Sequence, residues 1–528
     1  MKTAIRRWGA LLLALMLVSS VCFLFSCRKS GMFIDEIYTY GLSNSHNAPF
    51  LTDVLGGNMV DKVMTQQQFM DYMVVNEGEG FDFVSVYNNQ VADVHPPLYY
   101  WILNIVCSLT PGIFSMWSGL ILDYVIYMAA LVLLWALVME LFKSRSAAAA
   151  SVVMYGLSLL GLNTMLMIRM YVLMTMLTLL MCLSIAKLMG GKSLKWYTAL
   201  GLSIFLGLLT QYYFVFYAFF LCGFFVLYML FKKDWKGCVK FVLFAFAGVA
   251  LFIAVFPACF DHLFADKLVS GGNAVENLKD SSQYAKRIAY FVGEVRHGTK
   301  AAVISALLAL VLCLPFAGGV IKAAKAKEIR FEALIFIVPA FITLILVALI
   351  SPVLDQRYVY NIVPLFVLAV AFVLHVLEKS APDFKWKSVA LWCLTGCICL
   401  VCVWFARLYP PQYLYQHYTG YDAILEEHSD APCLYMTANY FAPMTQDLMQ
   451  LAIFPEVFIA DSADSAALDT YLDERESEEC VVFIDVSEFW SSGFKPEEML
   501  PALVDSTEYE SYELLYENAL SVTYLLTK

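Results

Sequence analysis

Charged residues are scarce in this sequence. They make up 15% of its 528 residues, whereas a soluble domain carries roughly 25%. Hydrophobic residues account for 61% and occur in runs of about 18 to 25 residues, the length that crosses a hydrocarbon core of about 30 Å as a helix. Helices are expected because lipid offers no water to an unsatisfied backbone. The composition therefore excludes a soluble protein and predicts a multi-spanning α-helical membrane protein.

A basic surface is also lacking. The formal net charge is −11, which argues against a surface for nucleic acids. Just over half of the Asp and Glu residues follow residue 408, so the C-terminal tail is acidic. Most of the 14 cysteines lie in apolar runs, where they pack as small hydrophobic residues. Cys433 and Cys480 lie in the tail and could form a disulfide if the tail is outside the cytoplasm.

About eleven hydrophobic segments are long enough to span a bilayer. The first follows the basic residues Lys2, Arg6 and Arg7, and we interpret it as a retained helix rather than a cleaved signal peptide. The segments are expected near residues 9–26, 114–141, 147–165, 169–188, 196–211, 213–231, 239–258, 301–321, 333–350, 358–377 and 388–406.

Lysine and arginine cluster in alternate loops, and cytoplasmic loops of membrane proteins carry such an excess. If the N-terminus is cytoplasmic, the loops on its side hold Lys143, Arg145, Lys187, Lys192, Lys195, Lys232, Lys233, Lys236, Lys240, Lys322, Lys325, Lys327, Arg330, Lys379, Lys385 and Lys387. We therefore expect a cytoplasmic N-terminus, an odd number of spans and an extracytoplasmic tail. We interpret the membrane as a bacterial plasma membrane.

Long segments then lie outside the cytoplasm. The transmembrane domain is expected at 1–407, with a first outer loop at about 28–112, and the tail at 408–528. A further outer segment, 259–299, contains an amphipathic stretch at 284–295. In the tail, strands are expected at 432–436, 457–460, 480–486 and 521–527, and helices at 444–453, 464–474 and 497–504. This alternation predicts a small α/β domain.

Two adjacent carboxylates, Asp35 and Glu36, follow the first span by fewer than ten residues, among aromatic side chains. A carboxylate that is partly desolvated at the outer interface has a raised proton affinity, which suits a general base. The alternative is ordinary, because acids just outside a helix are common and tyrosines form the interfacial belt.

The first outer loop ends in His95-Pro96-Pro97-Leu98-Tyr99-Tyr100. A residue before proline is held in extended backbone, so His95 is presented rigidly and a helix can begin after the prolines. Tyr99 lies at the start of that helix. The alternative is a rigid turn followed by an aromatic belt.

Two arginine-tyrosine motifs lie at outer ends of spans. Arg169 and Tyr171 separate two apolar runs, and Arg357 and Tyr358 precede another. An arginine beside a span is costly unless it is paired or hydrated, and it can bind a phosphate through forked hydrogen bonds. The alternative is snorkelling to lipid headgroups.

Gln211 and Tyr212 occupy another outer turn. An amide and a phenol are typical contacts for a sugar or a lipid headgroup, although they also suit an interfacial belt. Because the charged residues gather at outer helix ends rather than at mid-bilayer, an interfacial enzyme is favoured over a transporter.

Together these motifs resemble the GT-C glycosyltransferases of the protein O-mannosyltransferase and lipid A aminoarabinose-transferase type, in glycosyltransferase family 39. The resemblance covers about residues 1–380, and the His-Pro-Pro-Leu-Tyr-Tyr string is its most specific element. It rests on Asp35-Glu36 after the first span, His95 to Tyr100, Arg169-Met170-Tyr171 and Arg357-Tyr358, in that order.

The resemblance implies a sugar donor carried on a polyprenyl phosphate, and transfer of a hexose or pentose with inversion to an acceptor hydroxyl outside the cytoplasm. It implies that Asp35 is the catalytic base, that Glu36 positions acceptor or donor, and that His95 supports the Asp-Glu loop. Arg169 and Arg357 are then candidates for binding the donor phosphate. The other residues predicted to bind substrate are His95, Tyr99, Tyr171, Gln211, Tyr212 and Tyr358. The acceptor and the sugar remain open.

The resemblance also bears on cofactors. The leaving phosphate is charged before transfer, so cationic side chains can stabilise it and no metal is required. Asp35, Glu36 and His95 could still bind a divalent metal if they converge. Many family members carry a histidine near the turn that holds Gln211 here, so this position departs from the pattern.

Two other functions compete with the enzyme. A transporter or flippase of a lipid-linked substrate would need charges or broken helices at mid-membrane, preferably in repeated halves. A non-catalytic membrane scaffold would use the acidic tail to bind a partner and would tolerate loss of both Asp35 and Glu36.

Overall fold

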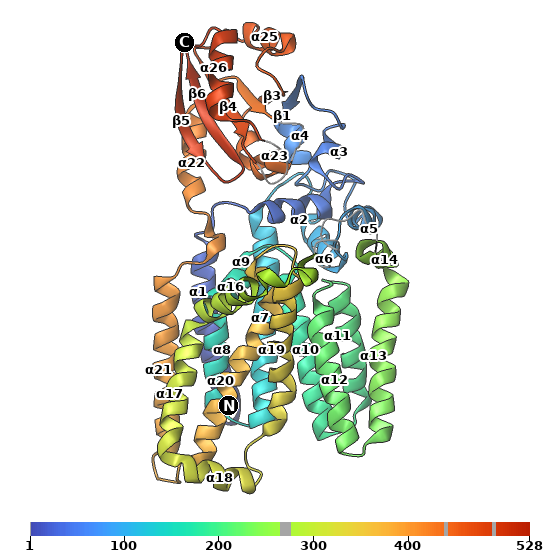
Figure 1. Ribbon diagram of the computed structural model, residues 1–528, viewed down its shortest axis with the longest axis vertical. Coiled ribbons are helices and arrows are strands. Elements are labelled where there is room, and N and C mark those ends of the chain that lie inside the picture. Colours follow the sequence, from blue (N-terminus) through green and yellow to red (C-terminus); the bar gives the residue numbers. More distant parts are fainter. Residues whose placement is uncertain (1, 265–275, 438–441, 488–492) are drawn as a thin grey trace. The chain divides into compact units, whose positions relative to one another are not determined.

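The computed structural model describes residues 2–264, 276–437, 442–487 and 493–528 (Figure 1). The chain divides into two compact units that alternate along the sequence. The helical unit comprises Met1–Cys27, Val94–Tyr99 and Leu120–Gln412, and the sheet unit comprises Arg28–Asp93, Tyr100–Gly119 and Tyr413–Lys528. Each unit is thus assembled from segments that are distant in sequence.

Long apolar helices make up most of the helical unit. Among the described residues, nine helical segments are long and apolar enough to cross a membrane. They are α1 (Lys2–Ser26), α7 (Met116–Phe142), α10 (Tyr171–Gly190), α12 (Phe214–Phe231), α13 (Trp235–Val255), α17 (Lys300–Cys313) with η2 (Leu314–Phe316) and α18 (Ala317–Lys325), η3 (Phe331–Ala333) with α19 (Leu334–Ile350), η4 (Gln356–Ile362) with α20 (Val363–Ser380), and α21 (Lys387–Leu408).

The span predicted near 147–165 is a broken helix. Its halves, α8 (Arg145–Gly156) and α9 (Leu159–Leu166), meet at 61°. Ser158 caps the second half by accepting a hydrogen bond from the Gly161 backbone N–H at 3.0 Å. A side chain at Gly161 would place its Cβ 2.1 Å from the Tyr155 carbonyl oxygen, so the tight break requires glycine.

The segment predicted near 196–211 is α11 (Leu194–Leu208), a shorter apolar helix that packs between α10 and α13. Helices α10 and α20 are mostly buried, whereas few residues of α13, α17 and α21 are buried. Their exposed side chains are large and apolar, for example Leu400 and Trp404. Surfaces of this kind are stable in lipid rather than in water. The prediction of a multi-spanning α-helical membrane protein is therefore confirmed.

Two short helices, α14 (Cys259–Phe264) and α16 (Tyr284–Gly298), lie in the segment between α13 and α17. The helix expected at 284–295 is therefore present, preceded by η1 (Ser281–Gln283). Arg287 of α16 is buried, and its guanidinium donates to the carbonyl oxygens of Ala348, at 2.8 Å, and Ser351. A cation at the C-terminal end of α19 satisfies its last carbonyl groups and complements the helix dipole.

A six-stranded mixed sheet organises the second unit, in the order β1-β3-β2-β4-β6-β5. Strands β3, β2 and β4 are parallel, and β1, β6 and β5 pair antiparallel at the two sides. The strands are β1 (Lys62–Thr65), β2 (Cys433–Met436), β3 (Glu456–Ala460), β4 (Glu479–Asp485), β5 (Ser511–Glu517) and β6 (Ser521–Thr527). Four strands and the small α/β domain were predicted, and these are confirmed, while β1 and β5 were not foreseen.

The helices of the sheet unit come from both parts of the sequence. From the first outer loop these are α2 (Ile34–Asn44), α3 (Leu51–Val54), α4 (Gln66–Asp71), α5 (Phe83–Ala92) and most of α6 (Leu98–Cys107). From the tail they are η5 (Gln412–Leu414), α22 (His417–Glu427), α23 (Ala442–Gln446), α24 (Leu448–Leu451), α25 (Ala466–Asp473) and α26 (Pro496–Ser506). The three helices expected in the tail are present. The first is divided into α23 and α24, and the other two are α25 and α26.

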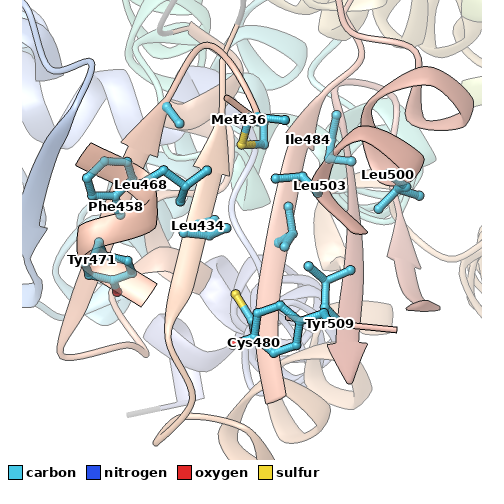
Figure 2. Packing of buried hydrophobic residues seen from close by; sticks show 14 residues of the cluster. Leu434, Met436, Phe458, Leu468, Tyr471, Cys480, Ile484, Leu500, Leu503 and Tyr509 are labelled. Atoms are coloured by element: carbon cyan, nitrogen blue, oxygen red, sulfur yellow. The ribbon is translucent and has the colours of Figure 1, made fainter. Parts of the chain in front are cut away.

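One face of the sheet packs on α25 and α26 through buried apolar side chains, including Leu434, Leu468 and Leu503 (Figure 2). Cys480 belongs to this cluster. Cys433 pairs in register with Val481, so its side chain lies on the opposite face of the sheet from Cys480. Both cysteines are free and buried.

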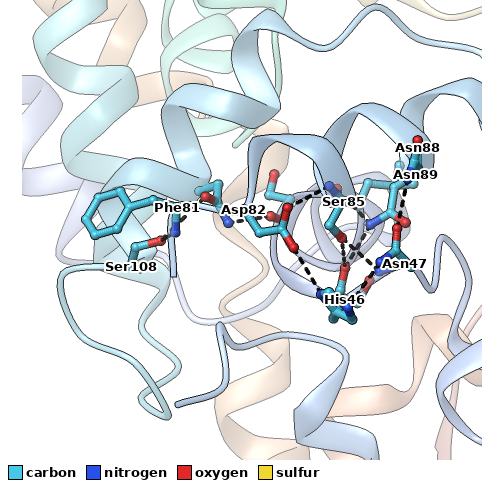
Figure 3. A network of polar contacts seen from close by, with 12 residues as sticks. His46, Asn47, Phe81, Asp82, Ser85, Asn88, Asn89 and Ser108 are labelled. Atoms are coloured by element: carbon cyan, nitrogen blue, oxygen red, sulfur yellow. Dashed lines mark hydrogen bonds and ion pairs between the residues drawn. The ribbon is translucent and has the colours of Figure 1, made fainter. Parts of the chain in front are cut away.

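A polar network ties the end of α2 to α5 (Figure 3). Asp82 caps α5 by accepting from the Ser85 N–H at 2.9 Å, and its other oxygen lies 3.1 Å from His46 Nδ1. Asn89 of α5 donates to the Ser45 carbonyl oxygen at 2.9 Å. The first outer loop is therefore held together by its own side chains, and it supports α2 from the C-terminal end.

Asp447, between α23 and α24, is buried in the sheet unit and accepts a hydrogen bond from Asn518 Nδ2 at 3.1 Å. Burial raises its pKa to about 7, and the charge of Asp485 adds to the rise. An unfolded Asp titrates near 3.9, so folding takes up a proton between about pH 4 and 7. The contribution of Asp447 to stability is therefore greatest at acidic pH and is lost as the pH rises towards 7.

We expect Asp447→Asn to stabilise the protein at pH 8, by up to about 4 kcal/mol, and to lose this advantage near pH 4. The amide stays neutral at every pH and can still accept from Asn518. Thermal unfolding of the full-length chain in detergent, compared across this pH range, measures the difference. The exposed Asp461→Asn variant is the control, and an equal pH response in both variants would contradict the assignment.

Candidate active site

Glu36 is the third residue of α2 and is fully buried. Its Oε2 accepts from the Phe33 backbone N–H at 2.7 Å, which closes the start of the helix, and from Lys29 Nζ at 3.0 Å. Lys29 is equally buried and also donates to the Tyr413 carbonyl oxygen at 2.7 Å. Glu36 therefore holds the turn before α2 in place through a cation that lies between two distant chain segments.

Asp35 differs from its neighbour, because it is only half-buried. It lies in the first turn of α2, where the helix dipole favours a carboxylate. Its backbone carbonyl accepts from Thr39 Oγ1 at 2.7 Å, so the main chain at this position is ordered within the helix. The two adjacent acids thus differ in burial, because Glu36 is completely buried in an ion pair with Lys29 and Asp35 is half-buried in the first turn of the helix.

The whole of α2 is fixed within the sheet unit. The Tyr40 hydroxyl donates to the Ser115 carbonyl oxygen and accepts from the Gly119 N–H, both at 2.9 Å. Gly41 faces the ring of Tyr72 so closely that a Cβ would lie 1.9 Å from it. Helix α2 also packs on α23 of the tail. Asp35 is therefore carried by a rigid support rather than by a loose loop.

A cavity of about 140 Å³ borders the start of α2 within the same unit. Met32 and Ile37 line one side, and Asp422, Gln446 and Gln450 of the tail line another. Burial raises the pKa of Asp422, which accepts from Gln450 Nε2 at 2.8 Å. The tail thus supplies polar groups beside the segment that carries the two acids.

The His95 motif begins α6 as expected, at Leu98. The Leu98 N–H donates to the carbonyl oxygen of Leu209 at 3.0 Å, two residues before Gln211. The Tyr99 hydroxyl donates to Asp123 Oδ1 of α7 at 2.7 Å, and both side chains are buried. Tyr99, which we predicted to bind substrate, therefore anchors the proline turn, and this turn lies against the turn that holds Gln211.

The two arginine-tyrosine motifs come together in the helical unit. Arg169, just before α10, is buried, and the Tyr171 ring packs edge-on against Tyr360 of η4, with centroids 5.9 Å apart. Segment η4 also contains Arg357 and packs along α10. The Arg169 and Arg357 motifs are nearly 190 residues apart in the sequence, but they lie on neighbouring segments of the helical unit.

The surroundings of Arg357 connect the two arginine-tyrosine motifs to the turn that holds Gln211 and Tyr212. The guanidinium lies 5.5 Å from the ring of Tyr358, and Nε lies 3.6 Å from Asp355 Oδ2. The Tyr358 ring stacks on Tyr213, with centroids 4.7 Å apart. Tyr213 directly follows Tyr212, so the Arg169, Gln211 and Arg357 motifs converge at the beginnings of α10, α12 and η4.

Three further residues were not predicted: Lys29 in the sheet unit, and Arg287 and His262 in the helical unit. His262 of α14 is buried, and its Nδ1 lies 2.8 Å from the Tyr212 hydroxyl. A histidine therefore lies beside the turn where Gln211 departs from the pattern of the resembled family. It is supplied by a segment about 50 residues further along the chain. The sequence offered no spacing signal for it, because α13 separates the two positions.

Within the described residues, no three His, Cys, Asp or Glu side chains lie close enough together to hold a metal ion. The cationic groups near the converging motifs are the side chains of Arg169, Arg357 and, on the neighbouring α16, Arg287. These groups can interact with an anion directly.

Comparison with known proteins finds one matching family and several similar structures. The sequence model of the dolichyl-phosphate-mannose-protein mannosyltransferase family matches residues 94–260. The crystal structure of ArnT from Cupriavidus metallidurans bound to undecaprenyl phosphate covers 98% of this chain and 98% of that chain, with a TM-score of 0.50 and 12% identity. ArnT in the apo state covers 99% and 98%, with a TM-score of 0.52 and 12% identity. No curated protein matches the chain by sequence.

The chain therefore has a GT-C fold, shared with ArnT over nearly its whole length. The resemblance to GT-C glycosyltransferases that the motifs indicated is therefore confirmed for the fold. The match at 94–260 contains the His95, Arg169 and Gln211 motifs. Fold and family match together indicate a glycosyltransferase of the GT-C type embedded in a membrane.

Proposed function

We propose that this protein transfers a sugar from a polyprenyl-phosphate donor to an acceptor hydroxyl outside the cytoplasm, with inversion. The observation that carries the proposal is the convergence of Arg169 and Arg357 at the beginnings of α10 and η4, beside the start of α12. Helix N-termini and arginine side chains both favour a phosphate group. The undecaprenyl phosphate in the ArnT structure supports the same class of lipid.

Asp35 is the proposed general base. Its half-buried carboxylate, at the start of an anchored helix, suits removal of the proton from an acceptor hydroxyl as the sugar is transferred. The bond from the sugar to the donor phosphate breaks, and the released polyprenyl phosphate carries the charge that Arg169 and Arg357 stabilise. The two arginines supply this stabilisation without a change in their own protonation.

The other predicted residues have supporting roles in this proposal. Glu36 positions Asp35 through its pair with Lys29, and Tyr99 positions the His95 turn through Asp123. His95, Tyr171, Gln211, Tyr212 and Tyr358 are proposed to contact the donor or the acceptor. We further propose that the N-terminus is cytoplasmic and the tail extracytoplasmic in a bacterial plasma membrane, as the basic loops indicate.

A transporter or flippase is the alternative. It would move the lipid-linked substrate without changing a covalent bond, and such proteins place their charges in broken helices near mid-membrane. The broken pair α8 and α9 is present here, but its buried polar residue Asn163 accepts from the Gln412 backbone N–H at 2.8 Å, an internal contact between helical segments. The charged motifs lie at helix beginnings, which favours the enzyme.

The test is an assay in nanodiscs with a panel of radiolabelled polyprenyl-phosphate sugars and an acceptor extract. We expect the wild-type protein to release polyprenyl phosphate, and Arg357→Gln to lower kcat/KM by about 10²–10³-fold because one donor to the leaving phosphate is lost. Arg330→Gln, a basic residue of a loop between α18 and α19, is the matched control and should behave as the wild type. Movement of intact donor across the bilayer, without release, would favour the flippase instead.

A further inference from the structure

An electropositive cavity lies in the helical unit, at the end of α20 opposite to the one where η4 carries Arg357. It has a volume of about 1110 Å³ and is formed where the α7–α8 turn, the end of α20 and the start of α21 meet. Helix α8 packs against both α20 and α21, so these three segments form one packed group. Ser144, Ser146 and Ser388 contribute hydroxyl groups to the lining.

Positive charge exceeds negative charge around this cavity. The lining holds five cationic side chains and three carboxylates, an excess of two positive charges. The cationic residues are Lys143, Arg145, Lys379, Lys385 and Lys387, and the acidic residues are Glu328, Glu378 and Asp383.

Two of these lysines are available to a ligand. Lys387 is engaged, because its Nζ lies 3.0 Å from Asp383 and donates to the Ala381 carbonyl oxygen at 2.8 Å. Lys379 and Lys385 are exposed and form no ion pair with any described residue. Lys385 lies over the ring of Trp386 instead, 5.5 Å from its centroid. Their charges are therefore not neutralised within the described part of the protein.

Two helices begin at the cavity, α8 at Arg145 and α21 at Lys387. Ser144 caps α8 through a long contact of 3.5 Å to the Ala147 N–H, and α21 has no side-chain cap. Backbone N–H groups and the positive ends of both helix dipoles therefore add to the lysine charges. This arrangement is suited to a phosphate group.

The walls of the cavity favour a lipid over a free phosphate. Met139, Leu391 and Trp392 also line it, and Trp392 belongs to the exposed apolar surface of α21 together with Val389 and Leu400. Acyl chains can extend along this surface, whereas inorganic phosphate would leave the apolar wall unused. Basic pockets between transmembrane helices typically bind anionic lipid headgroups.

We propose that this cavity binds the phosphate headgroup of an anionic phospholipid, with its acyl chains along α21. The ligand is a membrane component at the helix end where the basic loops gather, so the site is separate from the proposed transfer reaction. The inference does not depend on the proposed function, because it concerns lipid retention and not turnover.

The test uses the full-length chain in detergent, titrated with phosphatidylglycerol or phosphatidylcholine and observed by native mass spectrometry. We expect the wild type to retain phosphatidylglycerol preferentially, and Lys379→Gln combined with Lys385→Gln to bind it about tenfold or more weakly. Lys232→Gln combined with Lys233→Gln removes the same charge from the α12–α13 turn and should change affinity by less than about twofold. All four lysines are exposed, so folding should persist, as a thermal melt without lipid checks.

Equal losses in the two double variants, or equal binding of both lipids, would overturn the proposal. A parallel titration with inorganic phosphate distinguishes the source of the phosphate group. If inorganic phosphate stabilises the wild type as strongly as phosphatidylglycerol does, and the Lys379 and Lys385 substitutions abolish both effects, the occupant is free phosphate and the lipid assignment fails.

Discussion

Asp35→Asn is expected to abolish sugar transfer while leaving the protein folded. Asparagine has the same shape as aspartate but cannot take the acceptor proton, and loss of a general base typically lowers the rate by about 10²–10⁴-fold. Because Asp35 is half-buried and Tyr40 and Glu36 hold α2 through their own hydrogen bonds, the substitution should leave the helix anchored. The effect should appear in kcat, with donor affinity close to that of the wild type.

The measurement is release of labelled polyprenyl phosphate under saturating donor, together with a donor-binding titration and a thermal melt. Asp430→Asn, an exposed acid of the tail, is the matched control and should retain wild-type rates. Normal transfer by Asp35→Asn would remove this residue from the mechanism. A lower melting temperature accompanying the lost activity would mean that Asp35 is structural.

The second large effect concerns stability. Lys29→Met is expected to destabilise the protein by about 3–5 kcal/mol, because it leaves the Glu36 carboxylate buried without its cation. Both side chains are completely buried, so water cannot compensate for the loss. Since this pair fixes the turn before α2, transfer activity should fall together with the folded fraction.

A double-mutant cycle tests whether the pair itself is responsible. Combining Lys29→Met with Glu36→Gln removes both charges, and we expect most of the lost stability to return. The surface pair Lys528–Glu508 provides the control, because water screens it and Lys528→Met should have little effect. If the double variant is as unstable as Lys29→Met, the packing of the lysine stem rather than the charge is what matters.

Much of the fold could be predicted from local sequence. The hydrophobic segments became helices because a run of about 20 apolar residues has few stable alternatives in a membrane. Four strands of the tail were placed within about one residue, since short apolar runs between polar helices indicate a buried parallel strand. By contrast, β1 is a short and mostly exposed strand of the first outer loop. Its partner lies in the tail, so nothing near it in the sequence indicated the pairing.

The candidate site, like the fold, was determined partly by local sequence and partly by tertiary structure. The sequence alone determined which residue types stand at the beginnings of helices: Asp35, Glu36, His95, Arg169, Gln211 and Arg357. Only the tertiary structure distinguished the two acids, because it buries Glu36 completely in an ion pair with Lys29 and leaves Asp35 half-buried. It also brought His262 to Tyr212 and stacked Tyr358 on Tyr213. Periodicity and composition are local properties, whereas burial and ion pairing depend on which distant segments the packed helices bring together.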